Sequence, residues 1–218
     1  MLNYFTIVTI PELICFITAA VCLYNDKSPA WKWLVFYLFW VCLTEIGGIY
    51  LRARYGTNNW IYNILFLFEI ATIMIMFRAV LNPYRNSNKL ISVAAIVLYS
   101  VYLINTFAKK DSFFQHYSNT GIALAIVAAL LSFYFFYWFL NDDAYVPLFS
   151  SASFWWVSGT LLFYFGTTVI RVFYDYLSGV IPELTIYYIY RAVNITLYVC
   201  WSYSFICRRL RNPISRTL

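Results

Sequence analysis

The sequence predicts an all-α membrane protein: a seven-transmembrane-helix bundle with its N-terminus outside and its C-terminus in the cytoplasm. Three observations lead to this fold class. Of the 218 residues, 63% are hydrophobic and only 11% are charged, whereas a soluble domain carries about 25% charged residues. Seven apolar runs approach or exceed the length of about 20 residues that crosses a hydrocarbon core. Basic residues are distributed unevenly between the loops that these runs would place on the two sides of the membrane.

The seven runs follow one another with short connections. They are residues 4–24, 33–51, 60–81, 90–107, 117–140, 153–176 and 185–207. Turn-forming residues fill the connections, as in the stretches 25–29, 55–59 and 82–86. The fourth run is the shortest, and a six-span topology without it would reverse the second half of the chain. No basic residue precedes the first run, which we therefore interpret as a retained helix rather than a signal peptide.

The orientation follows from the Lys and Arg residues of the short loops, because cytoplasmic loops carry an excess of them. With the C-terminus inside, nine lie in the cytoplasm: Lys27, Lys32, Arg78, Arg85, Lys89, Arg208, Arg209, Arg211 and Arg216. Four lie outside: Arg52, Arg54, Lys109 and Lys110. This division predicts a transmembrane domain over residues 1–207 and a short basic cytoplasmic tail over residues 208–218.

Five ionisable residues lie inside the apolar runs, where a charge is costly and usually functional. They are Glu12, Glu45, Glu69, Arg171 and Arg191. Counted at 1.5 Å per residue, all five fall about 8–13 Å below the outer end of their helix, and Asn194 falls at about 13 Å. Independent substitutions would scatter over a core of about 30 Å, so the common depth predicts one polar cluster in the outer half of the bilayer.

Helical spacing places further polar side chains beside these charges. On the last run, Tyr187, Arg191, Asn194 and Tyr198 recur at intervals of four, three and four, which is one helix face. On the third run, Tyr62 shares a face with Glu69. Two interpretations remain open: a pocket open to the outside that binds a ligand or a proton, or a closed Glu–Arg network that only fixes helix packing.

A face of small residues marks the fifth run, where Gly121, Ala125 and Ala129 follow one another at intervals of four. Such faces allow two helices to approach closely. The partner is either another helix of the same bundle or a second copy of the chain in a homo-oligomer.

Enzymatic chemistry is not expected. The sequence contains no nucleophile motif of a known hydrolase class, and its single histidine, His116, excludes a histidine-based zinc or haem site. Asp142 and Asp143 form a carboxylate pair, but no further acidic residue follows at helical spacing, so we interpret them as a polar loop. We therefore expect no metal site and no cofactor.

Several short stretches resemble those of small, uncharacterised seven-span bacterial membrane proteins. They are Thr44-Glu45, Asn59-Trp60-Ile61-Tyr62-Asn63 with Glu69, Phe154-Trp155-Trp156-Val157-Ser158-Gly159 and Asn194-Ile195-Thr196-Leu197-Tyr198. Such proteins look similar to the membrane sensor halves of histidine kinases without the kinase domain. The resemblance implies a sensing module that works through a separately encoded partner, and it transfers no catalytic residue.

The sequence therefore favours a non-enzymatic module of the bacterial inner membrane that binds a small ligand or a proton and signals to a cytoplasmic partner. A transporter or channel that uses the same charges is the first alternative. A structural membrane subunit of a larger complex is the second. The expected partners are the lipid bilayer, this cytoplasmic protein or complex, and a second copy of the chain; no nucleic acid is expected.

Overall fold

The computed structural model describes residues 7–107, 118–142, 148–173 and 181–211. Within these ranges the chain forms seven α-helices and one short 3-10 helix, η2 (Leu148–Ser150). The helices are α1 (Thr9–Leu23), α2 (Pro29–Tyr55), α3 (Asn59–Leu81), α4 (Asn88–Phe107), α5 (Ser118–Leu140), α6 (Ala152–Val172) and α8 (Glu183–Arg211). Each predicted apolar run coincides with one of them, so the expectation of an all-helical chain is confirmed for the described residues.

The helices extend beyond the apolar runs where local signals favour it. Helix α2 begins at Pro29, four residues before the predicted run, because proline suits the first turn of a helix. It ends at Tyr55, where Gly56 adopts a left-handed conformation (φ 77°) and donates its backbone N–H to the Arg52 carbonyl. Helix α8 continues to Arg211. The first four residues of the predicted tail are therefore helical, and residues 212–218 lie outside the described ranges.

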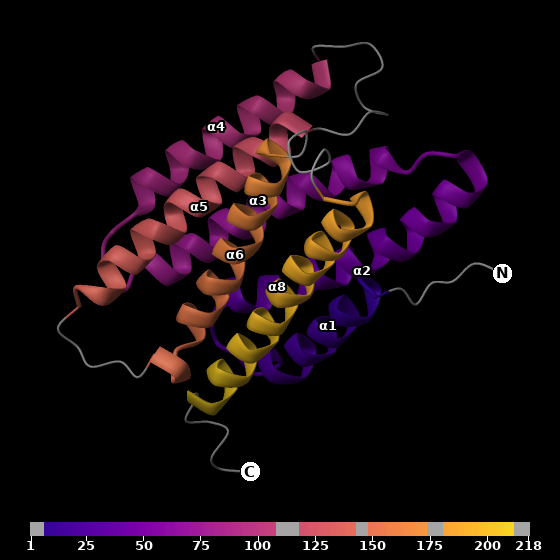
Figure 1. The fold of residues 1–218 in the computed structure, drawn as a ribbon. Helices are drawn as coiled ribbons and strands as arrows, with labels where there is room; N and C mark the ends of the chain where they lie inside the picture. The colour runs from indigo at the N-terminus through magenta and orange to yellow at the C-terminus, as the bar shows by residue number, and fades with distance from the viewer. Residues whose placement is uncertain (1–6, 108–117, 143–147, 174–180, 212–218) are drawn as a thin grey trace.

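Six helices form a closed ring, and α4 lies outside it. Around the ring, α1 packs on α2, α2 on α3, α3 on α5, α5 on α6, α6 on α8 and α8 on α1. Helix α4 packs on both α3 and α5, and Figure 1 shows it at one edge of the bundle, beside α5. The order of the ring thus differs from the order of the chain, because α4 is displaced from it. Residues that point into the ring come from six helices.

Four helices are long and apolar enough to cross a membrane: Pro29–Tyr55, Asn59–Leu81, Asn88–Phe107 and Asn119–Leu140. Helix α1 is apolar but has only 15 residues. The outer surface supports a lipid environment, since large apolar side chains are exposed there, as at Ile96 (66%) and Val93 (59%) on α4 and at Ile14 (55%) on α1. Membrane-length apolar helices are therefore confirmed for four of the seven predicted spans.

At one end of the bundle, the C-terminal part of α8 is tied to the connection between α1 and α2. The Arg208 guanidinium pairs with the Asp26 carboxylate at 2.8 Å and lies over the Trp31 ring, 5.2 Å from its centroid. The Asp26 side chain is only 1% exposed and also accepts the Ser28 backbone N–H at 2.7 Å. Within the described ranges this is the one ion pair closer than 4 Å. It fixes the register of α8 against α1 and α2.

We expect Asp26→Asn to destabilise the protein by about 2 kcal/mol, the usual range for a charge-assisted hydrogen bond. The loss stays moderate because Arg208 is 34% exposed and remains hydrated when its partner is neutral. Thermal unfolding in nanodiscs measures the effect. Lys32→Gln, at an exposed basic position of α2, serves as the control, and equal unfolding temperatures for the two variants would contradict a role of the ion pair.

Candidate functional site

The first predicted carboxylate, Glu12, lies inside the ring against α8. Helix α1 brings it there in its first turn, and its side chain is 97% buried, with 3% exposed. The Tyr198 hydroxyl of α8 donates a hydrogen bond to it. One turn along, Cys15 of α1 and Ser202 of α8 also share a hydrogen bond. The Oε2 atom of Glu12 has no hydrogen-bond partner, so this carboxylate can accept a further donor.

Glu45 of α2 pairs with the neighbouring helix α3. It accepts a hydrogen bond from the Tyr62 hydroxyl. Gly48, one turn from Glu45 on the same face, makes room for this tyrosine, since a Cβ atom at Gly48 would lie 2.9 Å from the Tyr62 hydroxyl oxygen. The Asn58 side chain donates to the Gly48 carbonyl at 3.1 Å and closes the same corner. Glycine at position 48 therefore sets the position of Tyr62 against Glu45.

Glu69 of α3 has its partners on α6, two places along the ring. The Tyr164 hydroxyl of α6 donates to its Oε1 atom at 2.6 Å, although the two residues are 95 positions apart. Arg171 of α6 interacts with Glu69 electrostatically. Its guanidinium lies beside Gly121 of α5, where a Cβ atom would approach Nη1 to 3.1 Å. Among the three carboxylates, Glu69 is thus the one with an arginine nearby, although Arg171 lies more than 4 Å from it.

Tyr37 links the three carboxylates into one cluster. It is buried (7% exposed) on α2 and interacts electrostatically with both Glu69 and Glu12. Glu12 interacts in the same way with Glu45. The structure thus places Glu12, Glu45 and Glu69 within electrostatic reach of one another or of the shared Tyr37. We call the three carboxylates and the four tyrosines around them the Glu–Tyr cluster: Glu12, Glu45, Glu69, Tyr37, Tyr62, Tyr164 and Tyr198.

The two predicted arginines do not close a salt-bridge network with these carboxylates. Among the described residues, no Glu–Arg pair lies within 4 Å. Arg191 instead stacks over the Tyr187 ring, 3.9 Å from its centroid, and donates to the hydroxyl of the same tyrosine. Tyr187 is 48% exposed. The described residues thus form no Glu–Arg ion pair within 4 Å, while Arg171 interacts with Glu69 electrostatically.

Two polar atoms of predicted site residues on α8 have no hydrogen-bond partner. Nε of Arg191 and Oδ1 of Asn194 are buried and have no hydrogen bond. Both residues lie on the face of α8 that carries Tyr198, one to two turns nearer the start of the helix. They lie nearer the N-terminal end of α8 than Tyr198 does. Nε of Arg191 is an unsatisfied donor, and Oδ1 of Asn194 is an unsatisfied acceptor. Buried groups of this kind are rare in native proteins and commonly bind water or a ligand.

Farther along α8 from the cluster, aromatic side chains fill the interior of the six-helix ring. Trp156 and Trp201 stack with ring centroids 5.7 Å apart, and Trp201 contacts Tyr37 at 6.4 Å and Tyr198 at 6.3 Å. Phe77 packs edge-on against Trp156 at 5.3 Å. Trp156 and Phe77 are fully buried. The polar groups therefore occupy one half of the ring interior, and a dense aromatic layer occupies the other.

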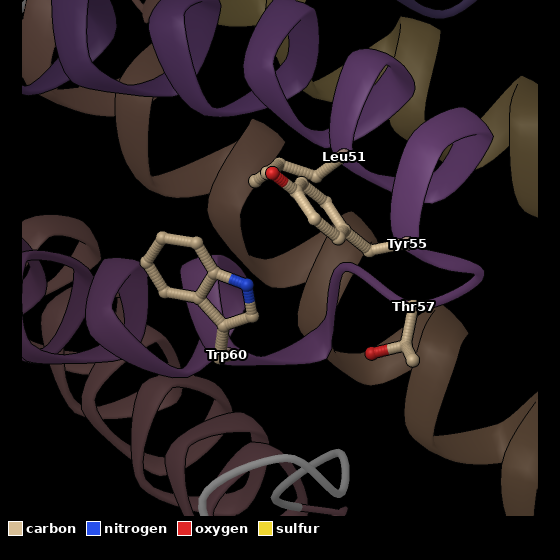
Figure 2. Close-up of a pocket in the computed structure, with 4 residues that line it drawn as sticks. All are labelled: Leu51, Tyr55, Thr57 and Trp60. Atoms are coloured by element: carbon tan, nitrogen blue, oxygen red, sulfur yellow. The ribbon is translucent and has the colours of Figure 1, made fainter.

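Two surface cavities are formed by described residues, and Tyr198 of the cluster lines one of them. One, of about 480 Å³, lies at the turn between α2 and α3, among Leu51, Tyr55, Thr57 and Trp60. Figure 2 shows the Tyr55 ring and the Trp60 indole on two sides of this space, with Thr57 at its edge. Aromatic side chains of this type are typical of the membrane–water interface. No residue of the Glu–Tyr cluster is among these lining residues.

The second cavity is a groove of about 350 Å³ between α1 and α8. Its walls are mainly apolar, and Pro11, Ile14 and Val199 contribute to them. Tyr198 also lines it, so the same side chain contacts the groove and donates to Glu12. Because Ile14 and Val199 are more than half exposed (55% and 59%), this groove opens on the apolar outer surface of the bundle rather than at its end.

The small residues of α5 pack inside the bundle at their first position. Gly121 is buried against Arg171 of α6 and Phe66 of α3, where a Cβ atom would lie 3.1 and 3.4 Å from the two side chains. Ala125 is 5% exposed, and Ala129 is half-buried. The contacts around Gly121 are those of a helix packed within its own chain.

Tyr37 and Tyr164 are the site residues that the sequence analysis did not select. Helical spacing does point to both residues. Tyr37 precedes Glu45 by eight residues and Tyr164 precedes Arg171 by seven, so each shares a helix face with a predicted site residue. Periodicity alone did not separate them from the many other tyrosines of the chain. Only the neighbouring helices show which tyrosines meet a carboxylate.

No protein-family model, no curated protein and no solved structure matches this chain.

Proposed function

We propose that this chain is an integral protein of the bacterial inner membrane with seven spans, N-out and C-in, and that it is a non-enzymatic binding module. Its Glu–Tyr cluster binds a proton or a small cationic ligand. Binding changes how the helices pack, and this change is transmitted to a separate cytoplasmic partner. One observation carries the proposal. Three carboxylates share one ring interior, each accepts a hydrogen bond from a tyrosine of another helix, and among the described residues none has a cation within 4 Å.

Electrostatics explains why such a cluster takes up positive charge. Three negative charges in one low-dielectric interior repel one another strongly. Tyrosine hydroxyls stabilise a carboxylate but do not neutralise it. Arg171 supports Glu69 alone, which leaves Glu12 and Glu45 in mutual repulsion. Protons or a cation bound between the carboxylates would remove that repulsion, and the titration of the three groups would be coupled.

The same hydrogen bonds supply a route for the signal. They join α1 to α8, α2 to α3 and α3 to α6, so a change in the charge of one carboxylate alters the packing of two helices. Helix α8 is joined again, nearer its C-terminal end, to Asp26 in the connection that follows α1. A shift of α8 would thus move its basic end, Arg208 to Arg211, which is where a cytoplasmic partner would bind. The shift requires that the bound and free states pack differently.

A transporter or channel remains the rival proposal. The aromatic layer of Trp156, Trp201 and Phe77 favours binding over passage, because it fills the ring beside the polar half. A structural subunit is the third proposal, and the unsatisfied groups of Glu12, Arg191 and Asn194 count against a purely structural cluster. Proton or ion flux in liposomes that disappears in Glu69→Gln would favour the transporter.

Infrared difference spectra between acidic and alkaline buffer test the proposal in nanodiscs. We expect the wild-type protein to show a titrating carboxyl band, and each single variant Glu12→Gln, Glu45→Gln and Glu69→Gln to remove part of it. Because the groups are coupled, each variant also moves the midpoint of the carboxyls that remain. Trp201 fluorescence reports the packing change, since this ring contacts Tyr37 and Tyr198.

Asp142→Asn is the matched control, because Asp142 is exposed at the end of α5 and lies outside the cluster. It should leave the midpoints unchanged. Trp201→Phe identifies the contribution of Trp201 to the fluorescence. A carboxyl band that is the same in all three Glu→Gln variants and in the wild type would rule the proposal out, and lower stability without any spectral change would favour the structural subunit.

A further inference from the structure

The hairpin of α3 and α4 carries three exposed cations and no acidic residue between them. Arg78 lies in the last turn of α3, Arg85 in the connection and Lys89 in the first turn of α4, and all three side chains are exposed. Among the described residues, the one ion pair closer than 4 Å joins Arg208 to Asp26. No described carboxylate therefore neutralises the three cations at that distance. We call Arg78, Arg85 and Lys89 the hairpin cations.

Hydrogen bonds fix the backbone that presents these cations. The Ser87 backbone N–H donates to the side-chain oxygen of Asn82 at 3.3 Å, and the Ser87 hydroxyl donates to the Arg85 carbonyl at 3.1 Å. The side-chain amide of Asn82 donates to that of Asn88 at 3.3 Å. The Arg85 guanidinium lies over the Trp138 ring of α5, 4.7 Å from its centroid. Because tryptophan is typical of the membrane–water interface, this contact favours a position of Arg85 at the level of the lipid headgroups.

An exposed apolar stripe of α4 begins at one of the hairpin cations. Lys89, Val93 and Ile96 follow one another at intervals of four and three, which is one helix face. Val93 is 59% and Ile96 is 66% exposed. Helix α4 lies outside the six-helix ring, at one edge of the bundle (Figure 1). In a bilayer the stripe faces hydrocarbon, so Lys89 lies at the end of a lipid-facing surface, where the headgroups begin.

We infer that the hairpin cations bind the phosphate group of an anionic phospholipid whose acyl chains lie along α4. The inference goes beyond the proposed function, because it requires a bilayer but not the Glu–Tyr cluster. Basic side chains at the membrane surface attract anionic lipids, and a guanidinium donates two parallel hydrogen bonds to a phosphate. Arg211 and Asp142 both interact electrostatically with Tyr84 of the same connection. Their opposite charges offset each other there, and the three positive charges of the hairpin remain.

The position of the hairpin favours a lipid over a soluble anion or an acidic protein. An acidic protein would meet the cations from the aqueous side alone and leave the α4 stripe uncovered. A lipid contacts both surfaces with one molecule. The acyl chains add little affinity, since one apolar neighbour of α4 replaces another, but they hold the phosphate at the level of Lys89. The charge of the headgroup must then supply the preference for one lipid over another.

Native mass spectrometry of the full chain in detergent micelles tests the inference. It compares the binding of phosphatidylglycerol with that of phosphatidylcholine, which has the same acyl chains but no net charge. We expect the wild type to prefer phosphatidylglycerol and Arg85→Gln to reduce the preference about fivefold, which is about 1 kcal/mol for one basic residue. Arg85→Lys should keep most of the preference, because it keeps the charge. Soluble glycerol phosphate should not displace the lipid.

Arg54→Gln is the matched control, since Arg54 is also exposed and lies over an aromatic ring, that of Tyr55 at 5.7 Å, but precedes the other end of α3. It should leave the lipid preference unchanged. An equal loss in Arg54→Gln and Arg85→Gln would overturn the inference. Equal binding of the two lipids by the wild type would also overturn it and favour an acidic protein as the partner of the hairpin cations.

Two further outcomes separate this inference from its neighbours. Displacement of phosphatidylglycerol by glycerol phosphate would overturn a lipid site in favour of a soluble phosphate ester. The titrating carboxyl band tests the Glu–Tyr cluster independently. If the band is present while the wild type shows no lipid preference, the inference alone is wrong. If the band is absent while the lipid preference is present and falls in Arg85→Gln, the inference holds and the proposed function is wrong.

Discussion

The Gly159→Ala variant is expected to unfold at a clearly lower temperature than the wild type. A Cβ atom at position 159 of α6 would lie 2.6 Å from Cβ of Cys200 on α8 and 3.3 Å from the Leu197 carbonyl oxygen. Neither neighbour can rotate away, because both belong to the backbone or are bonded to it, so the two helices must separate. Overpacking of this kind costs about 1–3 kcal/mol, which exceeds the gain of about 1 kcal/mol from replacing glycine in a helix.

The separation would also weaken the contacts around position 159. Thr160 accepts the Trp201 indole N–H at 3.2 Å, and Trp156 stacks on the same ring at 5.7 Å. Gly166→Ala is the matched control on the same helix, because its Cβ would lie an ordinary 3.4 Å from a Val193 methyl group. It should unfold at the wild-type temperature or above it. Thermal unfolding followed by tryptophan fluorescence compares the two, and equal behaviour would contradict the close α6–α8 contact.

The Gly48→Ala variant is expected to fold but to lose the response of Glu45. Its Cβ would lie 2.9 Å from the hydroxyl oxygen and 3.2 Å from a ring carbon of Tyr62. This neighbour is the far end of a side chain that can rotate, so the cost in stability is small. The rotation would remove the hydroxyl from Glu45, to which it donates. The carboxyl band of Gly48→Ala in infrared difference spectra should therefore change as strongly as in a Tyr62→Phe variant.

The adjacent glycine supplies the control for this prediction. A Cβ atom at Gly47 would lie 3.4 Å from the terminal carbon of Ile61, an ordinary van der Waals contact. Gly47→Ala adds the same methyl group one position away and should keep the wild-type spectrum. If Gly47→Ala and Gly48→Ala gave the same spectrum, Tyr62 would not control the charge of Glu45, and the cluster would reduce to Glu12 and Glu69.

The helices could be predicted because each needs only a property of its own residues. Apolar length located all seven, and the errors lie at the ends, where Pro29 and Arg211 extend a helix past its apolar run. Counting along one helix at a time likewise predicts a common depth for the three glutamates, and this depth stays a prediction.

The partners of those glutamates could not be predicted from the sequence. Charge complementarity suggested arginines, but Arg191 binds Tyr187, which stands four residues before it on the same helix and so lies within reach. Glu69 instead meets Tyr164, 95 residues away. Helical periodicity tells which residues share a face, but it does not tell which helix that face meets.

The sequence by itself determined that the described part of this protein is helical and apolar. Hydrophobic length and residue counting are local properties, and they survive any arrangement of the helices. Only the tertiary structure decided that α4 leaves the ring, that each carboxylate receives a tyrosine, and that Tyr198 lines a groove between α1 and α8. These features depend on the rotation and order of the helices, which are set by packing between residues far apart in the chain.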